Sequence, residues 1–282
     1  MCMSQLEQNV GKMKNVLESA IIKDGAVGQT SLIRSSQLIY LLHETIKEDI
    51  AEQGVDPNLI RPPIAATKPE MKIAGYLKRK DQDICVMPKD IKPQRRKISW
   101  GPEGFEDAYD EYGEEFTRHT LVINVRSQMS SLAKNTDTLF ERTFAEPMNL
   151  HMLYEDMVLG EVYLIPVYEY DQEAMKEKRV AFSNNHTNLE KYISFFSSIS
   201  GRAGSAGDLY KYERCALIIV DFSQNPPKLY HNTQELIDDN LVRKDFSIEY
   251  ADISYDKFIS KVLSVYNSRF GRNHIFRGEW YL

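Results

Sequence analysis

Cysteine is scarce in this chain, and the three cysteines that are present do not form a recognisable ligand set. Cys2, Cys85 and Cys215 are odd in number and widely separated, with no CxxC pair and no neighbouring pair of histidines. This spacing offers neither a disulfide framework nor a zinc site, and it fits a reducing compartment. The sequence therefore predicts a cytoplasmic protein that folds without covalent cross-links.

Long apolar runs and strong positive charge are also missing. No stretch approaches the ~20 consecutive apolar residues that a membrane-spanning helix needs. The first seven residues carry neither the basic region nor the apolar segment of a signal peptide, so we expect no membrane contact. The formal net charge of −6 argues against a polybasic protein that binds nucleic acid by charge alone, but a nucleic-acid enzyme needs only a local basic surface.

Several common catalytic motifs are absent as well. The chain has no GxSxG elbow, no HExxH pair and no Walker loop. Its six histidines are scattered, which leaves a histidine-centred metal cluster unsupported. The glycine-bearing stretch 201–207 lacks the lysine and the strand-to-helix context of a nucleotide-binding loop. The chemistry that remains is that of carboxylates and polar side chains on neighbouring strands.

The order of the apolar patterns predicts the fold class. With 282 residues and 42% hydrophobic residues, the chain can bury a substantial core. Two amphipathic helical patterns, at about 4–23 and 31–53, precede a proline-rich connection at 57–69. Apolar strand patterns follow at 84–87, 121–128, 157–170 and 215–222, and helical patterns at 130–150, 172–200 (in two pieces), 233–239 and 254–270. This order predicts an α/β fold with a small mixed central sheet flanked by helices. The helical segment 1–56 and an α/β domain over 70–282 are either two units or one continuous domain.

The stretch 121–135 is the most informative part of the chain. Leu121, Ile123 and Val125 alternate with the polar residues Asn124, Arg126 and Gln128, which is the period of a strand with two different faces. Large polar side chains are costly to bury unless something pairs with them. Two interpretations stay open here: a sheet edge whose polar face lies in water, and a polar row that faces a ligand.

Charged residues flank the strand predicted at 84–87. Asp83 stands at its very start, either as a solvated acid or as an acid that holds a divalent metal. A basic triplet precedes this acid, a basic stretch follows the strand, and the run 103–115 beyond it is strongly acidic. Such runs usually form solvated loops, but basic residues beside a metal-binding strand are also suited to phosphate contacts. The candidate DNA contacts are Lys78, Arg79, Lys80, Lys92, Arg95, Arg96 and Lys97.

These residues carry a resemblance to a known family. Asp83 at a strand start, followed 41 to 43 residues later by Asn124-Val125-Arg126, resembles the core of PD-(D/E)XK nucleases over about residues 70–170. The continuation from Arg126 to Asn135, and a helix bearing Glu141, looks like type II restriction endonucleases. The motif departs from the family pattern in two places. Asn124 stands where the family has an acid, and Arg126 stands where it has lysine.

The resemblance implies a restriction endonuclease-like fold and a set of catalytic roles. Mg²⁺ is the expected cofactor, held by Asp83 and Glu141 with Asn124 as an auxiliary ligand; Glu146 is an alternative to Glu141. Arg126 would stabilise the transition state, since arginine stays protonated, and Gln128 would position water.

The implied activity is sequence-specific hydrolysis of double-stranded DNA. An enzyme that cuts a symmetric site is expected to be a two-fold homodimer. The N-terminal helices are either that interface or ordinary core packing. The alternative is a non-catalytic DNA-binding or interaction protein on a degenerate nuclease fold.

Overall fold

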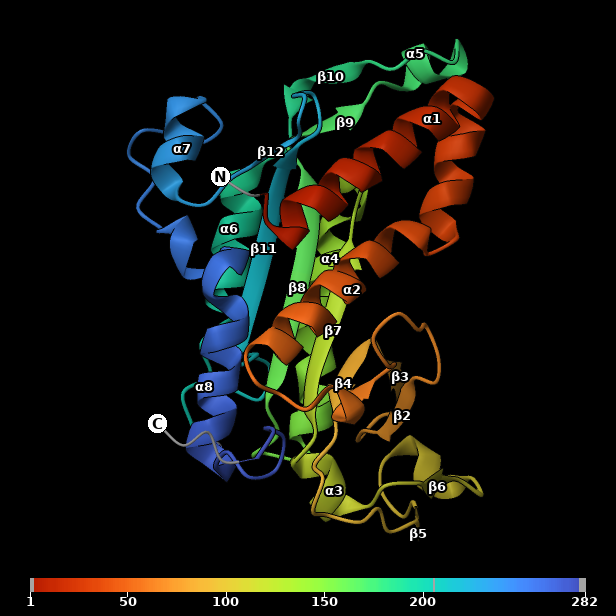
Figure 1. Cartoon of the computed structure of the whole chain (residues 1–282), viewed down its shortest axis with the longest axis vertical. Helices are drawn as coiled ribbons and strands as arrows, with labels where there is room; N and C mark the ends of the chain where they lie inside the picture. The colour runs from red at the N-terminus through yellow and green to blue at the C-terminus, as the bar shows by residue number, and fades with distance from the viewer. Residues whose placement is uncertain (1–2, 205, 279–282) are drawn as a thin grey trace.

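A six-stranded sheet forms the centre of the molecule (Figure 1). The computed structural model describes residues 3–204 and 206–278. Strands in the sheet follow the order β1-β4-β7-β8-β11-β12. Their bounds are β1 Ile60–Arg61, β4 Ile84–Val86, β7 Leu121–Ser127, β8 Leu159–Pro166, β11 Arg214–Asp221 and β12 Lys228–Leu229. β7, β8 and β11 are parallel, and the strands outside them pair antiparallel. The predicted α/β fold with a mixed central sheet is confirmed.

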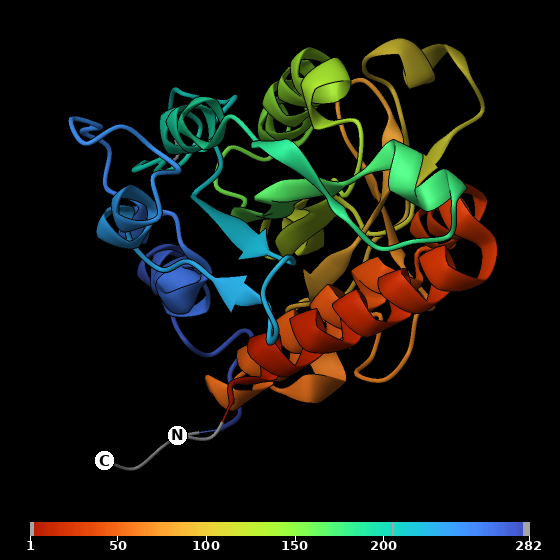
Figure 2. The same cartoon turned by 90° about the horizontal axis from the view of Figure 1, so that it is seen from above.

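Helices cover both faces of this sheet (Figure 2). One face packs against α1 (Gln5–Arg34), α2 (Gln37–Glu52) and α8 (Phe258–Phe270). The other packs against α4 (Leu132–His151), α6 (Leu189–Ser198) and the short α7 (Thr233–Asp238). Alternate side chains of β7 enter the two cores, with Ile123 and Val125 on the α2 face and Val122 on the α4 face. The polar residues of β7 share the parity of Val122, so they face α4.

Parallel strands require crossover connections, and these lie on the α4 face. α4 links β7 to β8, and α6 lies in the connection from β8 to β11. The face of the sheet that carries Asn124 and Arg126 is therefore covered by α4, which follows directly after β7.

The two predicted N-terminal helices are present and share one buried cluster with the sheet. The Ser4 side chain accepts a hydrogen bond from the Glu7 N–H and the Glu7 side chain returns one, a capping box that the sequence indicates. α1 does not stop near residue 23 as expected. It kinks at Gly25, which has φ +62°, and continues to Arg34. A Cβ at Gly25 would lie 2.5 Å from the Met175 carbonyl oxygen, so only glycine fits this bend.

Several small elements were not predicted from the sequence. Three hairpins, β2–β3, β5–β6 and β9–β10, lie outside the main sheet. Their bounds are β2 Met71–Ala74, β3 Arg79–Gln82, β5 Arg96–Lys97, β6 Tyr109–Asp110, β9 Tyr168–Tyr170 and β10 Phe182–His186. The further short elements are the helix α3 Glu114–Arg118 and the 3-10 turns η1 Pro57–Leu59, η2 Pro102–Phe105, η3 Tyr250–Asp252 and η4 Tyr255–Lys257. The short helix α5 Gln172–Lys176 is the first of the two helical pieces expected in 172–200.

Two sequence expectations are only partly correct in this part of the chain. The region 172–200 contains the two expected helical pieces, α5 and α6, but the strand β10, which was not expected, lies between them and pairs with β9. The expected strand 157–170 is two strands, β8 and β9, which belong to different sheets. Among the described residues, none of the helices combines the length and apolar character needed to cross a membrane. Residues 279–282 of the expected domain lie outside the described residues.

Candidate active site

Polar side chains from three neighbouring strands form a row on the α4 face of the sheet. Asn124 of β7 is paired in register with Glu161 of β8. Ile84 of β4 is paired with Ile123 of β7, and continuing this antiparallel register by one residue places Asp83 level with Asn124. Asp83, Asn124 and Glu161 thus lie across three adjacent strands, although they are far apart in the sequence.

Asp83 directly precedes the first residue of β4, at the point beyond which β7 has no β4 residue to pair with. Its Oδ2 accepts a hydrogen bond from the Val125 N–H at 2.9 Å, so the side chain replaces the missing strand partner. Its Oδ1 makes no hydrogen bond within residues 3–204 and 206–278. Oδ2 of Asp83 therefore stabilises the edge of β7, whereas Oδ1 is available to a ligand.

Arg126 lies one strand step beyond Asn124 and is the centre of a charge cluster. Its Nη1 lies 3.0 Å from Glu161 Oε1 and donates to Thr143 Oγ1 at 3.0 Å. Its Nη2 forms an ion pair with Glu146 of α4, which also pairs with Lys80 of β3. We call Lys80, Arg126, Glu146 and Glu161 the site cluster.

Burial shifts the pKa values of this cluster in ways that matter for chemistry. Complete burial raises the pKa of Glu161, and the charge of Arg126 only partly opposes this shift. Burial lowers the pKa of Lys80, and the neighbouring Arg126 lowers it further. Burial alone would lower the pKa of Arg126, but the carboxylate of Glu161 raises it. Arg126 therefore stays charged, whereas Lys80 loses its proton more readily than an ordinary lysine.

The buried oxygens in this row differ in how far they are paired. Asn124 is 3% exposed and Glu161 is fully buried. Glu161 is contacted by Arg126 and by the hydroxyl of Tyr212, whereas Asn124 Oδ1 has no hydrogen-bond partner in the described part of the chain. Buried polar atoms are normally hydrogen-bonded, so Asn124 Oδ1 is free to contact a ligand. No group of three His, Cys, Asp or Glu side chains placed to hold a metal occurs among the described residues; the row contains two acids and an amide.

An open pocket lies at the Asp83 end of this row. It has a volume of about 570 Å³ and is lined by Lys80, Asp83, Arg126, Gln128 and Arg142, together with the start of α2. We call it the site pocket. It brings together three of the residues predicted as catalytic, which come from the start of β4 and from β7.

The other two predicted catalytic residues differ in their placement. Asn124 lines an adjoining pocket that shares Lys80 and Arg142 with the site pocket. Glu141 is exposed on α4 and lies about 100° around the helix from Arg142, so the structure does not bring it to this group. Glu146, the alternative named from the sequence, does reach the cluster.

Gln128 is held in a defined orientation at the end of β7. Its Nε2 donates to the Ser131 carbonyl at 3.2 Å. Its Oε1 accepts from the hydroxyl of Tyr163 at 3.1 Å and lies 3.5 Å from the hydroxyl of Tyr192. The amide is thus oriented by both of its ends.

The predicted DNA-contact residues divide into paired and unpaired cations. Hairpin β5–β6 and its loops place the basic stretch against the acidic run, so Arg95 pairs with Glu111 and Arg96 with Asp110. Three further cations are also paired: Lys97 with Asp107, Arg79 with Glu103 and Lys80 with Glu146. Lys78 and Lys92 are exposed and form no ion pair within the described residues, and the same holds for Arg142 of α4.

Sequence reasoning missed Glu161 and gave Lys80 only a DNA contact. A signal for Glu161 was present, because it is a lone acid inside the apolar run of β8, and an acid on a strand buried on both faces needs a partner. Lys80 gave no comparable signal. It reaches the cluster through the packing of hairpin β2–β3, which sequence patterns did not reveal.

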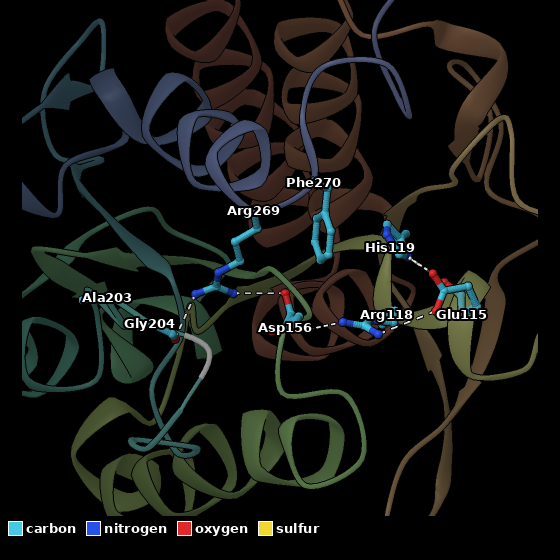
Figure 3. A pocket seen from close by; sticks show the side chains of 8 residues that line it. All are labelled: Glu115, Arg118, His119, Asp156, Ala203, Gly204, Arg269 and Phe270. Carbon is cyan, nitrogen blue, oxygen red and sulfur yellow. Dashed lines mark hydrogen bonds and ion pairs between the residues drawn. The ribbon is translucent and has the colours of Figure 1, made fainter.

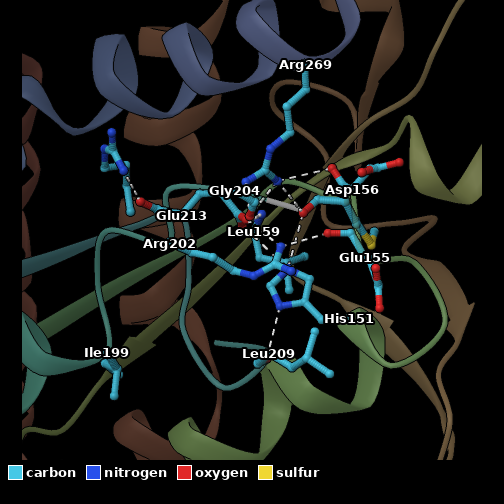
Figure 4. A network of polar contacts seen from close by, with 12 residues as sticks. His151, Glu155, Asp156, Leu159, Ile199, Arg202, Gly204, Leu209, Glu213 and Arg269 are labelled. Carbon is cyan, nitrogen blue, oxygen red and sulfur yellow. Dashed lines mark hydrogen bonds and ion pairs between the residues drawn. The ribbon is translucent and has the colours of Figure 1, made fainter. Parts of the chain in front are cut away.

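A second buried charge cluster lies where β8 and β11 begin, with Glu213 level with Leu159 (Figure 4). Glu213 Oε1 contacts the Nη1 atoms of Arg202 at 3.1 Å and Arg269 at 2.7 Å. Its Oε2 accepts from the Leu159 N–H at 2.7 Å and lies 3.6 Å from His151 Nε2. Burial alone would raise the pKa of Glu213, but His151 and Arg269 together lower it. We call His151, Arg202, Glu213 and Arg269 the end cluster.

A pocket of about 530 Å³ opens beside the end cluster (Figure 3). Arg118 and Arg269 lie on either side of Asp156, and Arg118 also pairs with Glu115. The His119 Nδ1 lies 2.8 Å from the Glu115 carbonyl. Since these groups already hold protein partners, this pocket is a weaker candidate than the site pocket.

Comparisons with protein-family models, with curated proteins and with solved structures gave no match for this chain. The resemblance to PD-(D/E)XK nucleases therefore stays a prediction.

Proposed function

We propose that this protein is a Mg²⁺-dependent endonuclease that hydrolyses phosphodiester bonds in double-stranded DNA, with a restriction endonuclease-like fold. The observation that carries the proposal is the spatial row of Asp83, Asn124 and Glu161 beside an open pocket lined by Arg126 and Lys80. The resemblance links Asp83 to Asn124 only through sequence spacing. Their adjacency on one sheet face supports that link.

The oxygens of this row fit a hard cation. Mg²⁺ prefers oxygen ligands, and the row offers the unpaired Asn124 Oδ1 between the carboxylates of Asp83 and Glu161. We assign the metal to Asp83, Glu161 and Asn124, with Glu161 in place of Glu141. When bound, Mg²⁺ supplies polarisation of a phosphoryl oxygen and activation of water.

The cations of the site have separable roles in this proposal. Arg126 stays charged, so it stabilises negative charge on the phosphate but does not accept a proton. Lys80, whose pKa burial lowers, is the basic group best suited to proton transfer. Arg142 is exposed and unpaired, and it binds the DNA backbone at the pocket mouth. Gln128, fixed at both ends, orients water.

The finer parts of the proposal follow the resemblance to type II restriction endonucleases. A cytoplasmic homodimer would match the symmetry of a palindromic DNA site. α1 carries exposed apolar side chains at Val16, Ile22 and Val27, which makes it our candidate for the dimer interface.

The proposal is tested by incubating the protein with unmethylated phage DNA, with Mg²⁺ or with a chelator. Discrete Mg²⁺-dependent fragments are expected. Asp83→Asn keeps an oxygen that accepts from Val125 but removes the charge, so cleavage should fall at least about a hundredfold, equivalent to ~3 kcal/mol of transition-state stabilisation. The matched control is Asp81→Asn, an acid two residues away whose side chain is 51% exposed. Equal loss in both variants, or none in Asp83→Asn, would refute the assignment.

A second function, DNA binding without cleavage on a degenerate nuclease fold, is favoured by one observation. Arg126 and Lys80 already neutralise Glu146, and Arg126 also pairs with Glu161. This reading predicts DNA retention that Mg²⁺ does not change and no fragments, also with Mn²⁺. The same incubation therefore separates the two functions.

A further inference from the structure

A second pocket lies beside the site pocket, between hairpin β2–β3 and α4. Its volume is about 340 Å³, at the lower end of the ~300–1,000 Å³ range that is usual for small-molecule sites. Leu77, Ala145 and Leu150 form apolar walls, and the amides of Gln82 and Asn124 lie among its polar lining. We call it the hairpin pocket.

The hairpin pocket combines apolar walls with buried amides. Gln82 is 2% exposed and Asn124 is 3% exposed. The Gln82 Nε2 donates to the Lys80 carbonyl at 3.1 Å, whereas Asn124 Oδ1 has no partner among the described residues. Apolar side chains can lie against the faces of a nucleobase, and amides recognise nucleobase edges by hydrogen bonds. The lining is therefore suited to a planar group with polar edges.

Cationic side chains line the hairpin pocket, and two of them also line the site pocket. Lys78 and Arg142 line it without an ion pair in the described part of the chain, and Lys80 lines it as well. Lys80 and Arg142 line both pockets. The two pockets are therefore neighbours, as a phosphate and an adjacent nucleotide of one DNA strand would require.

The wall formed by Leu77 is held in place by α4. Asn149 Oδ1 accepts from the N–H groups of Leu77 at 2.7 Å and Lys78 at 3.2 Å, and its Nδ2 donates to the Lys78 carbonyl at 3.2 Å. A Cβ at Gly75 would lie 2.1 Å from Asn149 Nδ2, so the turn packs too closely for any other residue. Leu77 is nevertheless 50% exposed. A rigid turn that presents an apolar side chain next to cations is a preformed wall.

We propose that the hairpin pocket binds one nucleobase turned out of the DNA helix, beside the phosphate that is cleaved. This inference rests on the proposed endonuclease function and adds a base-binding site to it. The base lies against Leu77, Ala145 and Leu150, and its edge faces the amide of Gln82. Removal of a base from the stack has a free-energy cost, which the binding in the pocket offsets.

The test uses Ala145→Phe, which fills the pocket from an exposed position on α4. The control is Ala133→Phe, the same change at another exposed position of the same helix that does not line the pocket. Equal melting temperatures establish that both variants fold. Ala145→Phe should cleave intact DNA at least about tenfold more slowly than Ala133→Phe.

A missing-base scan completes the test. Duplexes around the mapped cut site are prepared with one base removed at each position in turn. At one position, removal should tighten wild-type binding about tenfold, because no base needs to leave the stack, and should restore binding by Ala145→Phe. The inference is overturned if Ala145→Phe behaves like Ala133→Phe, or if no position restores it. If the wild-type protein cleaves no DNA, the proposed function fails instead.

Discussion

The site cluster and the end cluster are both buried groups of opposite charges, but they differ in how fully they are paired. In the end cluster, Glu213 accepts from two arginines and a backbone N–H. In the site cluster, Glu161 is contacted by Arg126 and by the hydroxyl of Tyr212, and Asn124 Oδ1 beside it has no hydrogen-bond partner among the described residues.

From this difference we infer a structural role for the end cluster and a ligand-binding role for the site cluster. A buried polar network with all its bonds made holds a fold in one arrangement, whereas a partly satisfied network carries an energetic penalty unless a ligand completes it. The shifts in pKa follow the same division, since the pKa of Glu161 is raised and that of Glu213 is lowered. Two buried glutamates on neighbouring strands thus have opposite roles.

The largest expected effect comes from breaking the end cluster. Glu213→Gln removes the negative charge that two buried arginines share, so the free energy of unfolding should fall by about 3–5 kcal/mol at neutral pH. Urea denaturation measures this loss. The control Glu173→Gln, at an exposed glutamate paired with Lys176, should change stability by less than about 0.5 kcal/mol.

The pH dependence of that loss follows from the lowered pKa of Glu213. A lowered pKa in the folded state contributes stability above the ordinary glutamate pKa, and this stability is lost as the pH falls through the lowered value. The difference between wild type and Glu213→Gln should therefore shrink in acid. A difference that grows in acid would contradict the paired state of Glu213.

A smaller effect on stability, with a large one on activity, is expected for Glu161→Gln. Arg126 keeps Glu146 as a partner, so stability should change by less than about 1 kcal/mol or increase. Cleavage should fall at least about tenfold if Glu161 completes the metal site. Denaturation and cleavage of the same preparation measure both quantities.

The pH dependence of this variant has the opposite sign. A raised pKa of Glu161 contributes stability in acid, and that contribution is lost as the pH rises through the raised value. The stability of Glu161→Gln relative to wild type should therefore increase with pH. If Glu161→Gln and Glu213→Gln shared one pH trend, the contrast between the clusters would be wrong.

The smallest expected effect is on DNA binding, and it compares an unpaired arginine at the surface with a paired one. Arg142 is unpaired at the mouth of the site pocket, whereas Arg95 pairs with Glu111. Arg142→Ala should weaken DNA binding and reduce the slope of log affinity against log salt by about 1. Arg95→Ala should change the slope less. Titrations of labelled duplex at several salt concentrations measure both, and equal slopes would remove Arg142 from the interface.

Local patterns were sufficient for most of the fold. The helices α2, α4, α6, α7 and α8 and the strands β4, β7, β8 and β11 follow from apolar periodicity and from apolar runs. The hairpins escaped detection because polar segments such as Arg79–Gln82 and Phe182–His186 become strands by pairing with a neighbouring strand. Pro147 remains within α4 rather than ending it, which periodicity alone did not decide.

The sequence by itself determined which residues were candidates: an acid at a strand start, and Asn124, Arg126 and Gln128 alternating along one strand face. Only the tertiary structure decided which groups meet. Glu161 joins Asn124 through the register between β7 and β8, Lys80 arrives through hairpin packing, and Arg95 and Arg96 are neutralised across β5–β6. Periodicity is a property of neighbouring residues, whereas register and ion pairing depend on contacts between distant segments, which form only when the chain folds.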